Sequence, residues 1–528
     1  MEDISRIDAD RVRLPLDIPI PSHLRDHHVE GKAVLPAVVA MQWLGETVRR
    51  FQPDVKICCM TRVRFDKFLY LPAGEKKIRA WVDIESRPGR DVTARLLTKT
   101  KSKKASITRT KEHAAIRYPR KKISSPLLPL DLNAAIEGVC FEVSPGKIYR
   151  ELVPFGPAFH NIKAPLILSQ HGGLAQIGSP PDKGFASVSK TLGSPFPLDA
   201  AFHAACVWGQ RYMGRVAFPV GLENRTVFKP TRSEERYFCR ILPIHRELNR
   251  QLVDIWIYDA DGTPFEYIGR VDMKDVSAGR VKPPAWLMED MEPESLPHVK
   301  SQCRAYSIIE LKAQMPFAEK TLAPREEKRI RKMGTKRKPS YLAARLACKR
   351  VSRLLSGNDT HTPASDIITV GADFRHPCCP PTDRSAVPGC SVSHDDRFAI
   401  AVAAPGPIGV DVEKASPRLL KSQALYMDAA ERALLQSSAL DEIQTAVRIW
   451  SAKEAAAKAL DISLADSWRR VKLWEIGRNE SRARIDLKHN LVIYHDEVGR
   501  HVFSVACLPQ TIEAPCGNLQ EKFDRRDF

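Results

Sequence analysis

The sequence predicts an α+β protein with more than one domain. The chain has 528 residues, and because a domain usually holds roughly 100 to 200 residues, this length favours two to four domains. Residues 33–48 and 200–213 are apolar on nearly every side, which predicts buried helices. Residues 78–85 alternate between apolar and polar side chains, which predicts a half-buried strand.

The first motif lies at residues 26–36 and reads Asp-His-His-Val-Glu-Gly-Lys-Ala-Val-Leu-Pro. It places His27, Gly31 and Pro36 in a His-x-x-x-Gly-x-x-x-x-Pro pattern. An isolated histidine is more often structural, and His28 is its neighbour, so the spacing to the glycine and proline is what selects His27. We treat His27 as a candidate general base.

Two further segments follow in the N-terminal half. Residues 149–159 begin with Tyr149 and end in Gly-Pro-x-Phe, and residues 196–203 contain Asp199 and, four positions later, His203. An aspartate before an alanine-rich run is commonly a helix N-cap. Asp199 can serve as both cap and catalytic acid, and His203 lies one helical turn after it.

In this order, the three segments resemble the dehydratase domain of polyketide synthases and polyunsaturated fatty acid synthases, which is a double hotdog fold. The resemblance implies loss of water from a β-hydroxyacyl thioester. His27 would remove the α-proton, and Asp199, kept protonated by an apolar tunnel, would protonate the leaving hydroxyl. His203 would orient the carboxyl group, and backbone N–H groups at the start of the first helix, near Gly31, would polarise the thioester carbonyl.

The C-terminal half carries two segments rich in acidic and basic residues. Residues 408–414 predict a strand on which Asp411 and Glu413 share one face. Residues 450–458 predict a helix whose stripe of residues four apart comprises Trp450, Glu454 and Lys458. Each segment alone is more often a solvated surface. Three carboxylates and a lysine that converge, however, suit a divalent cation and a phosphate anion.

Upstream segments add candidate ligands for an anion. Residues 341–354 predict a helix on which Arg345 and Lys349 share a face, and Ser393 and His394 end a predicted strand. With residues 408–458, they resemble 4′-phosphopantetheinyl transferases of the larger, surfactin-synthetase type. This family has a pseudo-twofold α+β fold.

The transferase resemblance implies a role for each of these residues. Asp411, Glu413 and Glu454 would hold Mg²⁺ against the pyrophosphate of coenzyme A. Either Glu454 or a water held by Glu413 would take the proton from the serine hydroxyl of an acyl carrier protein, and Lys458 would neutralise the leaving phosphate. The residues expected to bind coenzyme A are Arg345, Lys349, Ser393, His394 and Lys453.

One segment departs from the family pattern. Residues 374–381 stand where the family has a Gly-Lys-Pro turn, and the place of the lysine falls to either Arg375 or His376. The expected domains are therefore a dehydratase at 1–290, a basic linker at 291–340, a transferase at 341–510 and a polar tail at 511–528.

The charge of the chain indicates the kind of partner it binds. The formal net charge is +19, and basic residues crowd into 99–122 and 325–338. No zinc-finger, helix-turn-helix or RNA-binding pattern accompanies them, so we favour acidic carrier proteins over nucleic acid as the partner.

The 12 cysteines show no Cys-x-x-Cys spacing and no apolar leader precedes them, which predicts free thiols in a reducing cytoplasm. No apolar run is long enough to span a membrane.

The sequence thus predicts a bifunctional enzyme that loads acyl carrier proteins with the phosphopantetheine arm and dehydrates β-hydroxyacyl chains on that arm. No Gly-x-Asp-Ser-Leu carrier site and no ketosynthase motif occur in the chain, so substrate and target serine are expected on other proteins. An alternative is that the hotdog half only docks carriers while the transferase works. Dimerisation of the dehydratase half stays open.

Overall fold

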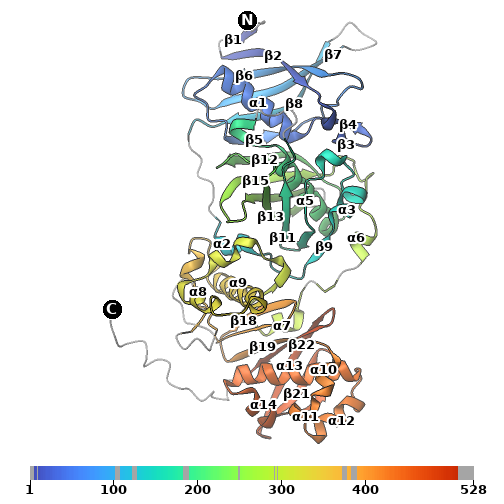
Figure 1. Ribbon diagram of the computed structural model, residues 1–528, viewed down its shortest axis with the longest axis vertical. Coiled ribbons are helices and arrows are strands. Elements are labelled where there is room, and N and C mark those ends of the chain that lie inside the picture. Colours follow the sequence, from blue (N-terminus) through green and yellow to red (C-terminus); the bar gives the residue numbers. More distant parts are fainter. Residues whose placement is uncertain are drawn as a thin grey trace, which may run out of the picture. The chain divides into compact units, whose positions relative to one another are not determined.

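The computed structural model describes residues 5–8, 10–101, 108–121, 128–181, 189–247, 250–289, 292–293, 295–371, 377–381 and 389–508. The chain divides into two compact units (Figure 1). The first unit comprises Met1–Leu127 and Cys140–Asp290, and the second comprises Leu128–Val139 and Met291–Phe528.

The first unit is a double hotdog. Thirteen of its described strands form one sheet in the order β1-β2-β6-β7-β8-β5-β12-β15-β14-β13-β11-β10-β9, and β3 pairs with β4 in a separate sheet. Helix α1 packs on β6, β7 and β8, while α5 packs on β11, β13 and β14, so each half of the sheet wraps one long helix (Figure 1). Antiparallel pairing of β5 with β12 joins the two halves. The elements are β1 (Ser5–Asp8), β2 (Arg11–Pro19), β3 (His28–Val29), β4 (Lys32–Ala33), α1 (Ala37–Phe51), β5 (Cys59–Arg64), β6 (Lys77–Glu85), β7 (Val92–Lys101), β8 (Thr108–Tyr118), β9 (Phe141–Val143), α3 (Pro145–Lys147), β10 (Leu166–Ser169), β11 (Gly172–Gly178), α4 (Ser189–Leu192), α5 (Phe196–Met213), β12 (Phe218–Val227), β13 (Arg236–Glu247), β14 (Arg250–Tyr258), β15 (Pro264–Lys274) and α6 (Trp286–Glu289).

The two buried helices begin elsewhere than the sequence predicted. Helix α1 starts at Ala37 because Pro36 takes the N-cap position, and Ala33, the first residue of the expected helix, ends β4 instead. Helix α5 starts at Phe196, so Asp199 lies in its first turn and is not the N-cap. Residues 196–211 are all buried, as a helix that is apolar all round requires.

The second unit contains two helix-on-sheet halves. In one, α9 packs on β16, β18 and β17, whose sheet order is β16-β18-β17; in the other, α13 packs on β19 and β23 of the sheet β19-β23-β22-β21-β20. This arrangement agrees with the predicted α+β transferase fold. The elements are α2 (Leu130–Ala134), α7 (Pro297–Ser301), β16 (Ala305–Glu310), α8 (Pro324–Ile330), α9 (Lys338–Leu355), β17 (Gly389–His394), β18 (Phe398–Ala404), β19 (Ile408–Lys414), α10 (Pro417–Lys421), α11 (Gln423–Tyr426), α12 (Ala429–Ser437), α13 (Glu442–Leu460), α14 (Leu464–Arg470), β20 (Val471–Ile476), β21 (Glu480–Ile485), β22 (His489–Val498) and β23 (His501–Cys507).

The segment Leu128–Val139 belongs to the second unit although residues of the first unit flank it on both sides. Its helix α2 is held by a buried ion pair, because the guanidinium of Arg353 on α9 donates to both carboxylate oxygens of Asp131, at 2.7 and 2.8 Å. Arg350 donates to the carbonyl oxygen of Ala135 at 2.6 Å. The connection between the two hotdog halves is therefore part of the C-terminal fold, and the expected continuous dehydratase at 1–290 is corrected.

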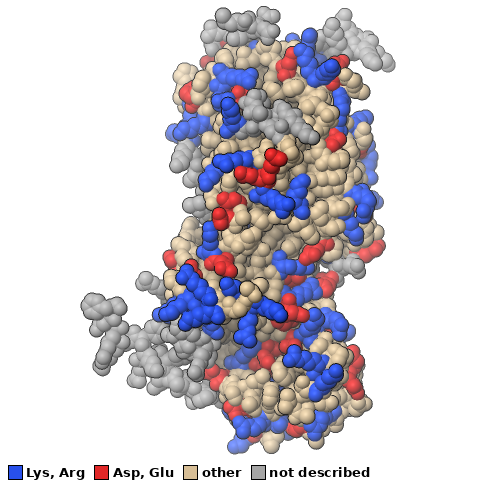
Figure 2. Space-filling view, viewed as in Figure 1, with Lys and Arg blue, Asp and Glu red and all other residues tan. Residues whose placement is uncertain are grey.

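The segment expected as a basic linker, 291–340, is also folded into the second unit. Strand β16 pairs with β18 along its whole length, and α8 turns Glu326 and Ile330 inward. The basic residues of 325–338 suggested a linker because most of them lie on the exposed side of these elements, where Figure 2 shows Lys and Arg side chains gathered around α8. The expected tail, 511–528, lies outside the described residues.

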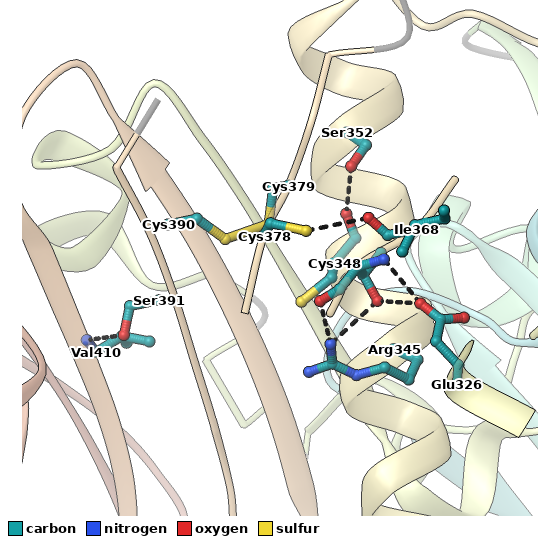
Figure 3. The surroundings of a disulfide bond; sticks show 11 residues. Glu326, Arg345, Cys348, Ser352, Ile368, Cys378, Cys379, Cys390, Ser391 and Val410 are labelled. Atoms are coloured by element: carbon teal, nitrogen blue, oxygen red, sulfur yellow. Dashed lines mark hydrogen bonds between the residues drawn. A yellow bond between two sulfur atoms is a disulfide. The ribbon is translucent and has the colours of Figure 1, made fainter. Parts of the chain in front are cut away.

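One disulfide corrects the prediction of free thiols. Cys379 is bonded to Cys390 at the start of β17 (Figure 3). The two cysteines are 11 positions apart in the sequence, and neither the adjacent cysteines at 378 and 379 nor any Cys-x-x-Cys spacing predicted their bond. In the part of the chain that the structure describes, no helix has the length and apolar character needed to cross a bilayer.

Candidate active sites

The ring of His27 is oriented to act as a base. Its Nδ1 atom lies 3.2 Å from the carbonyl oxygen of Val34, which can only accept a hydrogen bond, so Nδ1 carries the proton and Nε2 is left with its lone pair. The ring packs against Phe155 and Phe159, with centroids 4.3 and 5.2 Å away. Burial lowers the pKa of His27 to about 4, although the nearby charge of Asp199 acts in the opposite direction. His27 is therefore neutral at physiological pH.

Asp199 faces His27 from the first turn of α5, with its Oδ1 atom 4.0 Å from His27 Nε2. On the other side, Nε2 of His203 lies 2.9 Å from Oδ2 of the same carboxyl group. The hydroxyl of Tyr149 accepts hydrogen bonds from the backbone N–H groups of Asn161 and Ile162, so its own hydrogen points to His203 Nδ1 at 3.5 Å. This series of hydrogen bonds places the His203 proton on Nε2, toward the carboxyl group.

The Gly-Pro-x-Phe segment holds the loop that carries His27. The backbone N–H of Gly156 donates to the carbonyl oxygen of Asp26 at 2.7 Å, and that of Ala158 donates to the Asp26 carboxylate at 2.9 Å. A Cβ at position 156 would lie 2.4 Å from the Asp26 carboxyl carbon, so this position requires glycine. The motif thus fixes the residue that precedes His27.

Gly31 shapes the turn before the first long helix. It lies in the two-residue turn between β3 and β4 with φ +74°, a conformation that suits glycine. Helix α1 begins six residues later, at Ala37, and Ala37 lines the cavity described next. The start of the helix whose backbone N–H groups were expected to polarise a carbonyl group therefore lies at the cavity wall.

His27, Asp199 and His203 open onto one cavity of about 670 Å³ within the first unit. Its walls near these groups are apolar or aromatic and include Phe202 and Cys206. An acid and a base that face each other across an apolar cavity can abstract a proton from one atom of a substrate and protonate its neighbour.

In the second unit, Asp411 on β19 is the centre of a buried polar cluster. Its Oδ1 atom accepts hydrogen bonds from the Ser393 hydroxyl at 2.8 Å and from the Lys458 ammonium group at 3.0 Å. Lys458 also donates to the carbonyl oxygen of Val410 at 2.9 Å and lies 3.9 Å from Glu454. Residues of β17, β19 and α13 therefore converge, as the two sequence segments predicted.

The carboxylates of this cluster repel one another. Burial, followed by the charge of Asp411, raises the pKa of Glu454 to about 8 and that of Glu413 to about 7. Burial acts to raise the pKa of Asp411 as well, but Lys458 outweighs it, so this pKa lies below its ordinary value. Among the described residues, Asp411 Oδ2 is buried without a hydrogen-bond partner. Such a set of oxygen atoms suits a divalent cation.

Two predicted nucleotide ligands lie beside this cluster. His394 is exposed at the end of β17, and partial burial, then the charges of Lys458 and Arg345, lower its pKa. Arg345 is largely buried, donates to the carbonyl and hydroxyl oxygens of Thr369 and lies over the Tyr341 ring (Figure 3 shows Arg345 on α9). The structure thus brings His394, Arg345 and Lys458 to one side of the cluster.

Two other predicted ligands of coenzyme A do not reach solvent. The Lys349 ammonium group is fully buried, pairs with Glu326 at 3.0 Å and donates to two carbonyl oxygens. The Lys453 ammonium group is equally buried, pairs with Glu431 at 2.7 Å and donates to the carbonyl oxygen of Tyr426. Both lysines serve packing between elements of the second unit, so the cofactor-binding role predicted for them is wrong. Positions 375 and 376, the alternatives for the missing lysine, lie outside the described residues.

The sequence did not indicate one further acidic group. Possible ligand atoms of Asp395, Asp396 and His501 lie within 4.8 Å of one another. His501 Nδ1 is 2.5 Å from the Asp395 carboxylate, and Asp396 pairs with Lys414 at 2.8 Å. The two aspartates directly follow His394, but His501 comes from β23, so spacing alone could not join them.

Two models of known families match the chain. Residues 129–283 match the family model of the polyketide synthase dehydratase N-terminal domain, and residues 407–506 match that of the 4′-phosphopantetheinyl transferase superfamily. The chain joins a polyketide synthase dehydratase domain to a 4′-phosphopantetheinyl transferase domain. Asp199 and His203 fall within the first match, and Asp411, Glu454 and Lys458 fall within the second.

The dehydratase domain is also similar to solved structures. These include the dehydratase domain of a mycocerosic acid synthase-like polyketide synthase, which is 16% identical with a TM-score of 0.42 over 52% of this chain and 94% of that chain. They also include the dehydratase from the CurF module of the curacin polyketide synthase, with 16% identity, a TM-score of 0.41, and coverage of 52% and 96%. A trans-AT polyketide synthase dehydratase from Brevibacillus brevis has 17% identity, a TM-score of 0.40, and coverage of 50% and 93%. No curated protein sequence matches the chain.

Proposed function

We propose that the transferase domain moves the 4′-phosphopantetheine arm of coenzyme A to a serine of an acyl carrier protein. The observation that supports it most is the convergence of Glu454 and Lys458 on the buried carboxylate of Asp411, from two distant segments. Asp411, Glu413 and Glu454 would hold Mg²⁺, and the unpartnered Oδ2 atom of Asp411 fits a hard cation. When bound, the ion supplies positive charge for the pyrophosphate.

The protein's own residues then have distinct tasks. Lys458 holds the Asp411 carboxylate in place and lies close enough to the cluster to meet a phosphate oxygen. Either Glu454 or a water held by Glu413 would accept the proton of the attacking serine hydroxyl. Arg345 and His394, on the same side, are suited to the nucleotide end of coenzyme A.

Intact mass measurement tests the transferase. An apo acyl carrier protein of a polyketide synthase, incubated with the enzyme, coenzyme A and MgCl₂, is expected to gain the mass of one phosphopantetheine arm. The Asp411→Asn variant is expected to give no gain. A carrier that stays unmodified with the wild-type enzyme would remove this proposal.

We propose that the dehydratase domain removes water from β-hydroxyacyl thioesters carried on the same arm. The supporting observation is that neutral His27 and buried Asp199 face each other across the cavity. His27 Nε2 takes the α-proton. The Asp199 carboxyl group, whose Oδ2 atom lies 2.9 Å from His203 Nε2, gives its proton to the β-hydroxyl, which leaves as water.

Enoyl formation tests the dehydratase. A 3-hydroxybutyryl pantetheine thioester is expected to give the conjugated enoyl product, detected by its ultraviolet absorbance, and His27→Ala and Asp199→Ala are each expected to abolish it. If the wild-type protein only binds such thioesters, the hotdog half is the docking module that stands as the second hypothesis. The exposed basic residues around α8 favour an acidic carrier as the shared partner.

A further inference from the structure

The dehydratase cavity has a second pair of polar side chains on its wall, separate from His27 and Asp199. Thr98 on β7 and His113 on β8 both line the cavity, and the Thr98 Oγ1 atom is 2.8 Å from His113 Nε2. Their neighbours on the wall, Leu96 and Ala114, are apolar. Lys67 and Lys111 also line the cavity, so the pair belongs to a polar stretch of the lining that suits the polar groups of a bound molecule.

A β-bulge turns His113 toward the cavity. Leu96 pairs with Ala114 and Leu97 pairs with Glu112, so His113 is the extra residue and has no partner on β7. Side chains of consecutive strand residues normally point to opposite faces. Here His113 and Ala114 both line the cavity, because the bulge re-aims one of them. Bulges of this kind are frequent beside binding sites.

The hydrogen-bond directions leave a free acceptor on Thr98. His113 Nδ1 lies 3.1 Å from the carbonyl oxygen of Lys67, which can only accept, so Nδ1 carries the proton. Nε2 of the neutral ring then accepts, and the Thr98 hydroxyl must donate its hydrogen to it. Burial lowers the pKa of His113, which keeps the ring neutral. The lone pairs of Thr98 Oγ1 remain available to a substrate.

We propose that Thr98, oriented by His113, is a specificity site of the dehydratase that accepts a hydrogen bond from an O–H or N–H group of the bound thioester. Two parts of such a substrate carry this chemistry: the amide and hydroxyl groups of the pantetheine arm that N-acetylcysteamine lacks, and a second hydroxyl on the acyl chain. The inference rests on the proposed dehydratase function and adds to it the kind of substrate group that the cavity selects.

The test compares wild type, Thr98→Val and Thr98→Ser on three thioesters. The 3-hydroxybutyryl thioester of N-acetylcysteamine has a short arm and no second acyl hydroxyl. The 3-hydroxybutyryl pantetheine thioester extends the arm, and the 3,5-dihydroxyhexanoyl thioester of N-acetylcysteamine extends the acyl chain. Thr98→Val keeps the shape of the side chain and removes its oxygen, whereas Thr98→Ser keeps the hydroxyl.

The expected result is a selective loss. Thr98→Val lowers kcat/KM about tenfold on the pantetheine thioester, on the dihydroxy thioester or on both, while the short reference substrate keeps its rate and Thr98→Ser restores the loss. A loss confined to the pantetheine thioester assigns the contact to the arm, and one confined to the dihydroxy thioester assigns it to the acyl chain.

Two results would overturn the inference. Unchanged kcat/KM on all three thioesters would show that Thr98 contacts none of these groups, and an equal loss on all three would show that the pair only supports the bulge. A wild-type enzyme that dehydrates none of the thioesters would instead remove the proposed dehydratase function, so the two failures are distinguishable.

Discussion

The two candidate active sites each use a buried aspartate, yet their surroundings differ. Asp199 lies between two histidines in an apolar cavity, where burial keeps the neighbouring base, His27, neutral. Asp411 lies among other carboxylates and a lysine, where burial, followed by the charge of Asp411, raises the pKa of Glu454 and Glu413. The first site is complete with protein groups alone, whereas the second has an excess of negative charge that a cation would relieve.

The largest expected effect is on the site that needs a cation. Asp411→Asn removes the charge at the centre of the cluster, and we expect transferase activity to fall at least about a thousandfold. EDTA should have a similar effect on the wild type. Intact mass measurement of the carrier gives the rate, and Asp466→Asn, an exposed aspartate on α14, is the control. Retained transferase activity in EDTA would contradict the proposed metal dependence.

A matching substitution in the dehydratase site should leave transferase activity unchanged. His27→Ala removes the proposed base, and we expect enoyl formation to fall by about 10²- to 10³-fold. His28→Ala is the control, because it changes the adjacent ring while His27 stays in register with Gly31 and Pro36. Absorbance of the enoyl product reports the rate. If His28→Ala were the inactive variant, the assignment of the base would be wrong by one residue.

The pH profile should separate the sites further. The pKa of His27 is lowered to about 4, so this base stays unprotonated well below the ordinary histidine value of about 6.5. Lowering the pH from 7 to 5.5 should therefore leave kcat/KM of the dehydratase nearly unchanged, and the loss should begin only near pH 4. An acid limb centred near 6.5 would mean that His27 is exposed in solution.

The smallest effect is on stability and concerns the segment that links the hotdog halves. Asp131→Ala leaves the buried guanidinium of Arg353 without its carboxylate, which should destabilise the second unit by about 3 kcal/mol. Calorimetry of the full chain should show a lower unfolding temperature for the second unit and an unchanged unfolding temperature for the first. Asp17→Ala, which removes an exposed ion pair, is the control. An unchanged thermogram would contradict the assignment of this segment to the second unit.

Local features of the fold and sites followed from the sequence. Strand β19 and helix α13 contain the predicted segments at 408–414 and 450–458, because side-chain periodicity and motif spacing are local properties. The position of Asp199 opposite His27 followed from the family resemblance. The start of α1 did not, because the pairing of β3 with β4 competes with helix formation there.

Burial of charged residues could not be predicted in the same way. Lys349 and Lys453 look like surface cations in the sequence, and each becomes an internal group only because a glutamate on another helix, α8 or α12, meets it. The role of Asp131 depends likewise on Arg353, far along the chain. His113 lines the cavity because of a bulge, and one sequence does not show strand register.

One mass spectrum tests the central claim that a single chain loads the arm and dehydrates what the arm carries. An apo acyl carrier protein is incubated with the full-length enzyme, 3-hydroxybutyryl coenzyme A and MgCl₂. With the wild type, the carrier should gain the acylated arm and then lose the mass of one water; His27→Ala should give the gain without the loss, and Asp411→Asn should give neither. Loss of water that persists in His27→Ala, or no gain with the wild type, would contradict it.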